Sequence, residues 1–221
     1  MRSDDQLAAI ILIIRSRTGV SEHMRSNVNL GRHPHRRPLF ATISLAIITS
    51  VNAQVAQFPG TKSETKSPDG RYTIQNRDRE NTEPAHVLFL LDRRNGSKTL
   101  IQSYDRSVDI FWSPKSDAFV INDHEGSDSA RPLLYSLPWN DTKIDLLEKL
   151  KVFLRGRHQE NLVVGNDHVY LLARRWINSR ELLCRLEAYG EASHTGSGFT
   201  GYYLYEIGNG FRPYEPKGQP N

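Results

Sequence analysis

Short apolar stretches separated by turn-forming residues make up most of the chain from Ser67 onward. Six of them have the length of β-strands and are rich in β-branched or aromatic residues, which favours strands. They cover residues 71–75, 86–91, 98–102, 108–112, 118–122 and 133–137. Asn95-Gly96 lies between the second and third stretches and is a typical hairpin turn. The pattern therefore predicts an antiparallel meander.

One segment, residues 142–155, instead has the spacing of an amphipathic helix. Its apolar side chains recur three and four positions apart and are Leu146, Leu147, Leu150, Phe153 and Leu154. Thr142, followed three residues later by Asp145, resembles a capping box, and Gly156 suits a helix end. We expect this helix to cover one face of a sheet.

Strand patterns resume after the helix at 162–164, 168–176, 181–188 and 200–207. Residues 178–180 predict a tight hairpin between the second and third of these strands. The Gly- and Ser-rich segment 191–198 predicts a flexible loop, and the proline-containing tail from Asn209 predicts poor order. The fold class is mainly β, with one covering helix and a C-terminal β-hairpin region.

The segment from Met24 to Ala53 has the three-part layout of a secretory signal peptide. A basic stretch without acidic residues precedes an apolar run over 39–48, and small residues then lead to Ala53. The run is too short to span a bilayer, and Gln54 stands where a lipoprotein would carry cysteine. We expect cleavage after Ala53, an extracytoplasmic (periplasmic or secreted) protein and no stable membrane insertion.

Residues 1–23 fit a signal peptide poorly because Asp4, Asp5 and Glu22 are acidic. We therefore expect Met24 to be the true start and 1–23 to be an over-extended, disordered leader. The expected organisation then continues with the signal peptide at 24–53 and a flexible lead-in at 54–66. A single mainly β domain follows at 67–208, with a flexible tail at 209–221.

The basic overall charge of the chain comes from the leader. Of the 29 Lys and Arg residues 7 precede Gln54, and of the 25 Asp and Glu residues 3 do, which leaves 22 of each in the rest. The remaining charges are interspersed, unlike the basic stripe of a nucleic-acid-binding protein. We therefore expect no nucleic-acid partner.

Cys184 is the one cysteine of the chain, so no intramolecular disulfide can form. Strand alternation places it on the same face as Leu182 and Leu186. We expect a buried, unreactive thiol, because reactive cysteines need an exposed and electropositive setting.

A short motif occurs twice. Ser67-Pro68-Asp69-Gly70 precedes one predicted strand, and Ser113-Pro114-Lys115-Ser116-Asp117 precedes another 46 positions later. Behind the first copy come a strand ending in Asp92, an Asn-Gly turn and a further strand, and Phe111-Trp112 leads into the second copy. This arrangement resembles the WD40-like blade repeat of TolB-type β-propellers over residues 67–137.

The resemblance implies an antiparallel meander with two blade-like repeats. A closed propeller needs at least about four blades, whereas only two copies are legible and Lys115-Ser116 replaces Asp-Gly in the second. The expected fold is an incomplete propeller-like sheet or a small sandwich, capped by the helix.

Candidate chemistry is sparse. The densest polar cluster, residues 122–129, offers Asp123, His124, Glu125 and Asp128 as candidate metal ligands, although their spacing does not match an EF-hand and a solvated turn is the favoured interpretation. No P-loop, G-x-G-x-x-G, HExxH or nucleophile-elbow motif occurs, so we expect no cofactor.

Two functional hypotheses follow. The first is a non-catalytic exported binding module, for which Tyr202, Tyr203 and Tyr205 suggest a protein or glycan partner. The alternative is an exported hydrolase or metal-binding enzyme whose site is assembled from distant loops. Its candidate residues are Asp123, His124, Glu125, His168 and His194.

Overall fold

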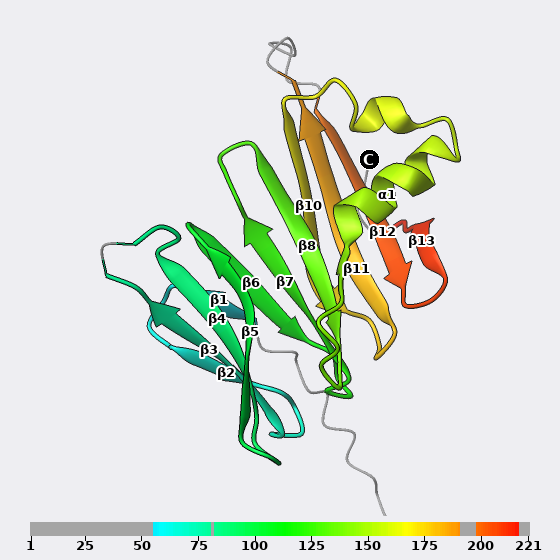
Figure 1. The fold of residues 1–221 in the computed structure, drawn as a ribbon. Helices are drawn as coiled ribbons and strands as arrows, with labels where there is room; N and C mark the ends of the chain where they lie inside the picture. The colour runs from blue at the N-terminus through cyan, green and yellow to red at the C-terminus, as the bar shows by residue number, and fades with distance from the viewer. Residues whose placement is uncertain (1–54, 81, 191–197, 217–221) are drawn as a thin grey trace, which may run out of the picture. The chain divides into compact units, whose positions relative to one another are not determined.

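The computed structural model describes residues 55–80, 82–190 and 198–216. The fold in these ranges is mainly β, as predicted, and Figure 1 shows the order of its elements. The strands are β1 (Ala56–Phe58), β2 (Glu64–Lys66), β3 (Tyr72–Asp78), β4 (His86–Asp92), β5 (Ser97–Tyr104), β6 (Ser107–Trp112), β7 (Ala118–His124), β8 (Ser129–Ser136), β9 (Lys143–Asp145), β10 (His168–Trp176), β11 (Glu181–Tyr189), β12 (Phe199–Glu206) and β13 (Gly210–Pro213). One α-helix, α1 (Leu146–Arg155), and one 3₁₀ turn, η1 (Glu160–Leu162), complete the described elements.

The described strands form two sheets. The smaller has the order β2-β3-β4-β5 and is antiparallel throughout. The larger has the order β1-β6-β7-β8-β10-β11-β12-β13, with β9 pairing on β8. Both sheets have free edges within the described residues, so these strands form open sheets rather than a closed propeller.

The strands β6, β7 and β8 lie between two hydrophobic cores because their side chains alternate between two faces. One face, which includes Ile110, Phe119 and Tyr135, packs against apolar side chains of the four-stranded sheet and forms the first core. The opposite face, which includes Val120 and Leu134, packs against α1 and against β10–β13 and forms the second core. Apolar residues on both faces explain why these strands read as nearly continuous hydrophobic runs.

The larger sheet changes direction between β8 and β10. These two strands pair in parallel over only two residue pairs, Ser129 with Val169 and Ala130 with Tyr170. Beyond that point β10 leans over β7 and β6, where Trp176 donates its indole N–H to the carbonyl of Phe111 at 3.1 Å. The inner face of β10–β13 thereby reaches the second core.

Helix α1 covers this second core with the predicted face. Leu146, Leu147, Leu150 and Leu154 are buried, and Phe153 packs against the core. The predicted start is wrong, however. Residues 143–145 form β9, and the cap is Asp145, whose Oδ1 accepts the N–H of Leu147 at 2.9 Å and of Glu148 at 3.1 Å.

The two copies of the short motif adopt matching turns. Ser67 N–H donates to Tyr72 O and Ser113 N–H to Ala118 O, both at 2.9 Å. Ser116 has φ of 60° at the place where Gly70 has 73°. The copies also touch, because Asp69 N–H donates to Ser116 Oγ at 3.0 Å.

Three local predictions differ from the structure. Residues 162–164 form no strand, because Leu162 ends the 3₁₀ turn η1. The expected lead-in over 54–66 contains β1 and β2, and β1 pairs with β6 rather than with its neighbour in sequence. The expected tail contains β13, which pairs with β12 and covers the core with Phe211. The pairing of β1 with β6 is long-range and leaves no local signal, whereas β13 follows β12 across a short turn at 207–209 that the predicted pattern does not include.

Other predictions lie partly or wholly outside the described residues. The signal peptide at 24–53, the leader at 1–23 and most of the loop at 191–198 fall there. Cys184 is fully buried in the second core, as predicted, and burial raises the pKa of its thiol. No helix within the described ranges is long and apolar enough to cross a membrane.

Candidate functional site

A partly buried chain of polar side chains connects the four-stranded sheet to β7 and β8. The hydroxyl of Tyr135 donates to Gln102 Oε1 at 2.7 Å, and Gln102 Nε2 donates to Asp123 Oδ2 at 2.9 Å. Burial raises the pKa of the Asp123 carboxyl above its ordinary value, and the negative charge of Glu125 acts in the same direction. Asp123 is thus the most perturbed carboxyl of the predicted cluster.

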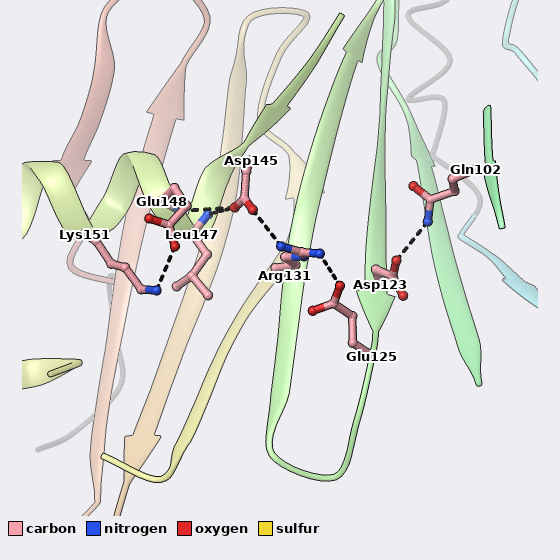
Figure 2. A network of polar contacts seen from close by, with 8 residues as sticks. All are labelled: Gln102, Asp123, Glu125, Arg131, Asp145, Leu147, Glu148 and Lys151. Atoms are coloured by element: carbon pink, nitrogen blue, oxygen red, sulfur yellow. Dashed lines mark hydrogen bonds and ion pairs between the residues drawn. The ribbon is translucent and has the colours of Figure 1, made fainter. Parts of the chain in front are cut away.

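A second set of contacts lies beside it and centres on Arg131 (Figure 2). The guanidinium of Arg131 pairs with Glu125 on one side and with Asp145 Oδ2, at 3.2 Å, on the other. Asp145 uses its other oxygen to cap α1. Arg131 therefore links the β7–β8 hairpin to the start of the helix.

The remaining members of the predicted cluster lie elsewhere. His124 follows Asp123 on β7, so it points to the opposite face of the sheet, where its Nε2 lies 3.0 Å from Asp109 Oδ2. Asp128 lies at the start of β8, with its Oδ1 3.7 Å from His168 Nδ1. His194 lies outside the described residues.

The four described histidine and carboxylate candidates for hydrolysis therefore have four different partners. Asp123 contacts Gln102, His124 contacts Asp109, Glu125 contacts Arg131 and His168 contacts Asp128. In the described ranges no three His, Cys, Asp or Glu side chains are arranged to hold a metal ion. The two polar sets tie elements together: Gln102 joins one sheet to the other, and Arg131 joins a sheet to a helix.

The tyrosines of β12 lie on alternating faces of the strand. Tyr203 and Tyr205 are both buried in the second core, against Phe211. Tyr202 is on the opposite face and is half-buried. Packing in the core therefore buries two of the three tyrosine rings that the sequence suggested as partner contacts.

A different surface carries exposed apolar side chains, namely the side of the four-stranded sheet that points away from β6–β8. We call this surface the outer face. Its central strand β4 contributes Phe89 and Leu91, and β5 contributes Leu100, which lies directly opposite Phe89. Leu100 is 51% exposed, and Phe89 and Leu91 are half-buried. These three side chains form a contiguous apolar centre.

Cations surround this centre. The Lys98 ammonium lies 4.4 Å from the centroid of the Phe89 ring, and the Arg77 guanidinium lies 5.5 Å from it. Partial desolvation lowers the pKa of Lys98, and the nearby positive charge of Arg77 adds to this effect. Both cations thus lie over the aromatic ring while their charges stay at the surface.

Two more cations lie along the β2 side of the outer face. Arg93 donates from Nε to Thr73 Oγ1 at 2.9 Å and lies 4.0 Å from Glu64. Lys66 lies 3.5 Å from the same carboxylate. Within the part of the chain that the structure describes, the strands and turns of the outer face therefore carry four cations, Lys66, Arg77, Arg93 and Lys98, against one carboxylate, Glu64.

One sequence signal could have indicated this surface. The strand β4 reads His-Val-Leu-Phe-Leu-Leu-Asp, with apolar residues at consecutive positions. Such a run is typical of a strand that is covered on both faces. Leu88 and Leu90 are covered by the first core, whereas Phe89 and Leu91 on the opposite side are only partly covered. On this side of β4 Val87 is fully buried, whereas Phe89 and Leu91 have no complete cover among the described residues.

Comparison with protein-family models finds no match to this chain, and comparison with curated proteins finds none either.

Proposed function

We propose that this chain is an exported, non-catalytic interaction module that binds a partner protein through the outer face of its four-stranded sheet. One observation carries the proposal: Leu100 is 51% exposed beside Phe89, at the centre of a sheet face ringed by cations. An apolar centre with a polar rim is the usual anatomy of a protein interface. Export is part of the proposal and rests on the leader pattern at 24–53.

Other exposed apolar residues support the choice of this face by contrast. Val152 on α1 and Val164 after η1 are each 65% exposed, but neither has a contiguous apolar and aromatic neighbour on a sheet. Single exposed apolar side chains are ordinary at protein surfaces, whereas a clustered group marks a binding region. Leu100 is therefore a better candidate for a binding residue than Val152 or Val164, although both are more exposed.

The alternative, an exported hydrolase, receives less support from the geometry. A catalytic group needs a second functional group within hydrogen-bond reach. His124 has one such group, Asp109 Oδ2 at 3.0 Å, but no other predicted candidate joins this pair, and His168 and Asp128 are 3.7 Å apart. Asp123 is hydrogen-bonded to Gln102, and Glu125 is paired with Arg131.

Site-specific photo-crosslinking in cells tests the proposed function. A photoreactive amino acid replaces Leu100 in the full chain, and the matched control replaces Val152 on α1. We expect a discrete crosslinked protein adduct from position 100 in the extracytoplasmic fraction and none from position 152. Equal adducts from both positions, or none from position 100, would contradict the proposal, as would recovery of the chain in the cytoplasm alone.

A further inference from the structure

We propose that the partner of the outer face is an acidic protein segment that carries a large apolar side chain. This inference rests on the proposed function and specifies the chemistry of its partner. The apolar side chain would cover Leu100 and Leu91, and the carboxylates would pair with the cations at the rim.

The charge of the outer face selects an acidic partner. Lys98 and Arg77 flank Phe89 with no carboxylate bonded to either ammonium or guanidinium in the described contacts; Lys98 instead donates to Gln75 Oε1 at 3.3 Å. Their positive charge is therefore uncompensated at the surface. Complementary charge across an interface raises both specificity and association rate, so a partner with carboxylates at matching positions is favoured.

A second copy of this chain is disfavoured by the same charges. A two-fold symmetric contact places a surface patch against itself. Two outer faces would then bring Arg77, Lys98 and their symmetry mates together, and like charges in an interface are unfavourable. Among the described strand residues of this face Glu64 is the one carboxylate, and Lys66 and Arg93 already lie within 4.0 Å of it.

A nucleic acid also fits less well. Proteins that bind single strands stack bases on free aromatic rings and follow the backbone with a basic groove. The ring of Phe89 is instead occupied by Lys98 and Arg77. The chain from Gln54 onward has equal numbers of acidic and basic residues, so it has no net positive charge to attract a polyanion.

NMR titration of the full chain, with its leucine methyl groups labelled, tests the partner chemistry. The first ligand is a peptide as long as β5, which has eight residues, built of alternating Glu and Leu. Comparison ligands are the same peptide with Lys for Glu, the same peptide with Ser for Leu, a single-stranded DNA oligonucleotide of matched length and phosphatidylglycerol vesicles.

We expect the Glu-Leu peptide to shift the methyl signals of Leu100 and Leu91 and to bind about tenfold more weakly to Lys98→Glu and to Leu100→Ser. Binding should weaken as salt is added, and Val152→Ser should bind like the unmodified chain. The Lys-Leu and Glu-Ser peptides should bind at least about tenfold more weakly than the Glu-Leu peptide.

Three results would overturn the inference. The Lys-Leu peptide could bind as tightly as the Glu-Leu peptide, the oligonucleotide or the vesicles could shift the same signals more strongly, or no peptide could shift them at all. None of these results removes a crosslink from position 100 in cells, so failure of the partner chemistry can be distinguished from failure of the proposed function. Unchanged methyl signals elsewhere in each variant show that it remains folded.

Discussion

The side chain of Asn122 on β7 hydrogen-bonds both backbone groups of Ala173 on β10. Its Nδ2 donates to the carbonyl of Ala173 at 2.9 Å, and its Oδ1 accepts the N–H of Ala173 at 2.8 Å. Asn122 is 2% exposed. One residue after Ala173, β10 has a bulge in its pairing with β11. The amide of Asn122 thus replaces a strand neighbour where β10 has separated from β8.

Asn122→Ala should therefore strongly destabilise the fold. The change leaves a buried N–H and a buried C=O of Ala173 without partners, and each loss lowers the free energy of unfolding by about 1–3 kcal/mol. Urea unfolding measures the difference. Asn209→Ala, at an exposed turn, is the matched control and should change the free energy of unfolding by less than about 0.5 kcal/mol. An equally small effect at Asn122 would show that the contact is dispensable.

Asp123→Asn should stabilise the protein at neutral pH. The pKa of Asp123 is raised in the folded state, so its ionised form is disfavoured there. This penalty is absent below the ordinary pKa of aspartate and grows as the pH rises through the raised folded value. Asparagine keeps an oxygen for Gln102 Nε2 but carries no charge. The gain should appear at neutral pH and vanish in acid, as measured by urea unfolding across pH.

Asp78→Asn is the control for that experiment, because it should change the free energy of unfolding in the opposite direction. Its hydrogen bond with His86, at 2.7 Å, lowers the pKa of Asp78, and Asn76 acts in the same direction. The stability that this carboxylate contributes is present above the ordinary pKa of aspartate and is lost as the pH falls through the lowered value. Asp78→Asn should therefore destabilise at neutral pH. If both variants changed the free energy of unfolding in the same direction at neutral pH, the raised pKa of Asp123 would not be a source of instability.

Arg131→Gln should weaken the junction between the β7–β8 hairpin and α1. The change leaves Glu125 and the capping residue Asp145 without their shared cation. Because the Arg131 side chain is 38% exposed, solvent screens the pairs, and we expect a loss of about 1 kcal/mol in the free energy of unfolding. Thermal unfolding at low and high salt measures it. Lys151→Gln, which removes one exposed pair with Glu148 on the helix, should lose less than about 0.5 kcal/mol.

Ser116→Ala should loosen the contact between the two repeated turns. Ser116 Oγ accepts the N–H of Asp69, and its removal leaves that N–H without its acceptor. A loss of about 1 kcal/mol in the free energy of unfolding is expected, measured by urea unfolding. Ser97→Ala at the exposed start of β5 should be nearly neutral. If Ser116→Ala is also neutral, the two turns are independent of one another.

The pattern along the chain determined the local structure well. Alternating and continuous apolar runs located most strands because β-strand side chains have a period of two, and the leucine spacing located the covered face of α1 because helix side chains repeat at three and four. The matched turns at Gly70 and Ser116 were visible as a repeated motif. Burial of Cys184 followed from its apolar neighbours on the same strand face.

The tertiary structure alone decided which surfaces meet. Residues 143–145 form a strand because β8 offers a free edge, and Phe211 belongs to a strand because β12 does. Strand alternation sends the adjacent residues Asp123 and His124 to opposite faces, but only the fold decided that they meet Gln102 and Asp109 there. The larger sheet covers one side of β4. The side that it leaves uncovered is the outer face around Leu100. The pairing of β1 with β6 and the packing of one sheet on the other depend on contacts between segments far apart in the chain, and those contacts have no local pattern in the sequence.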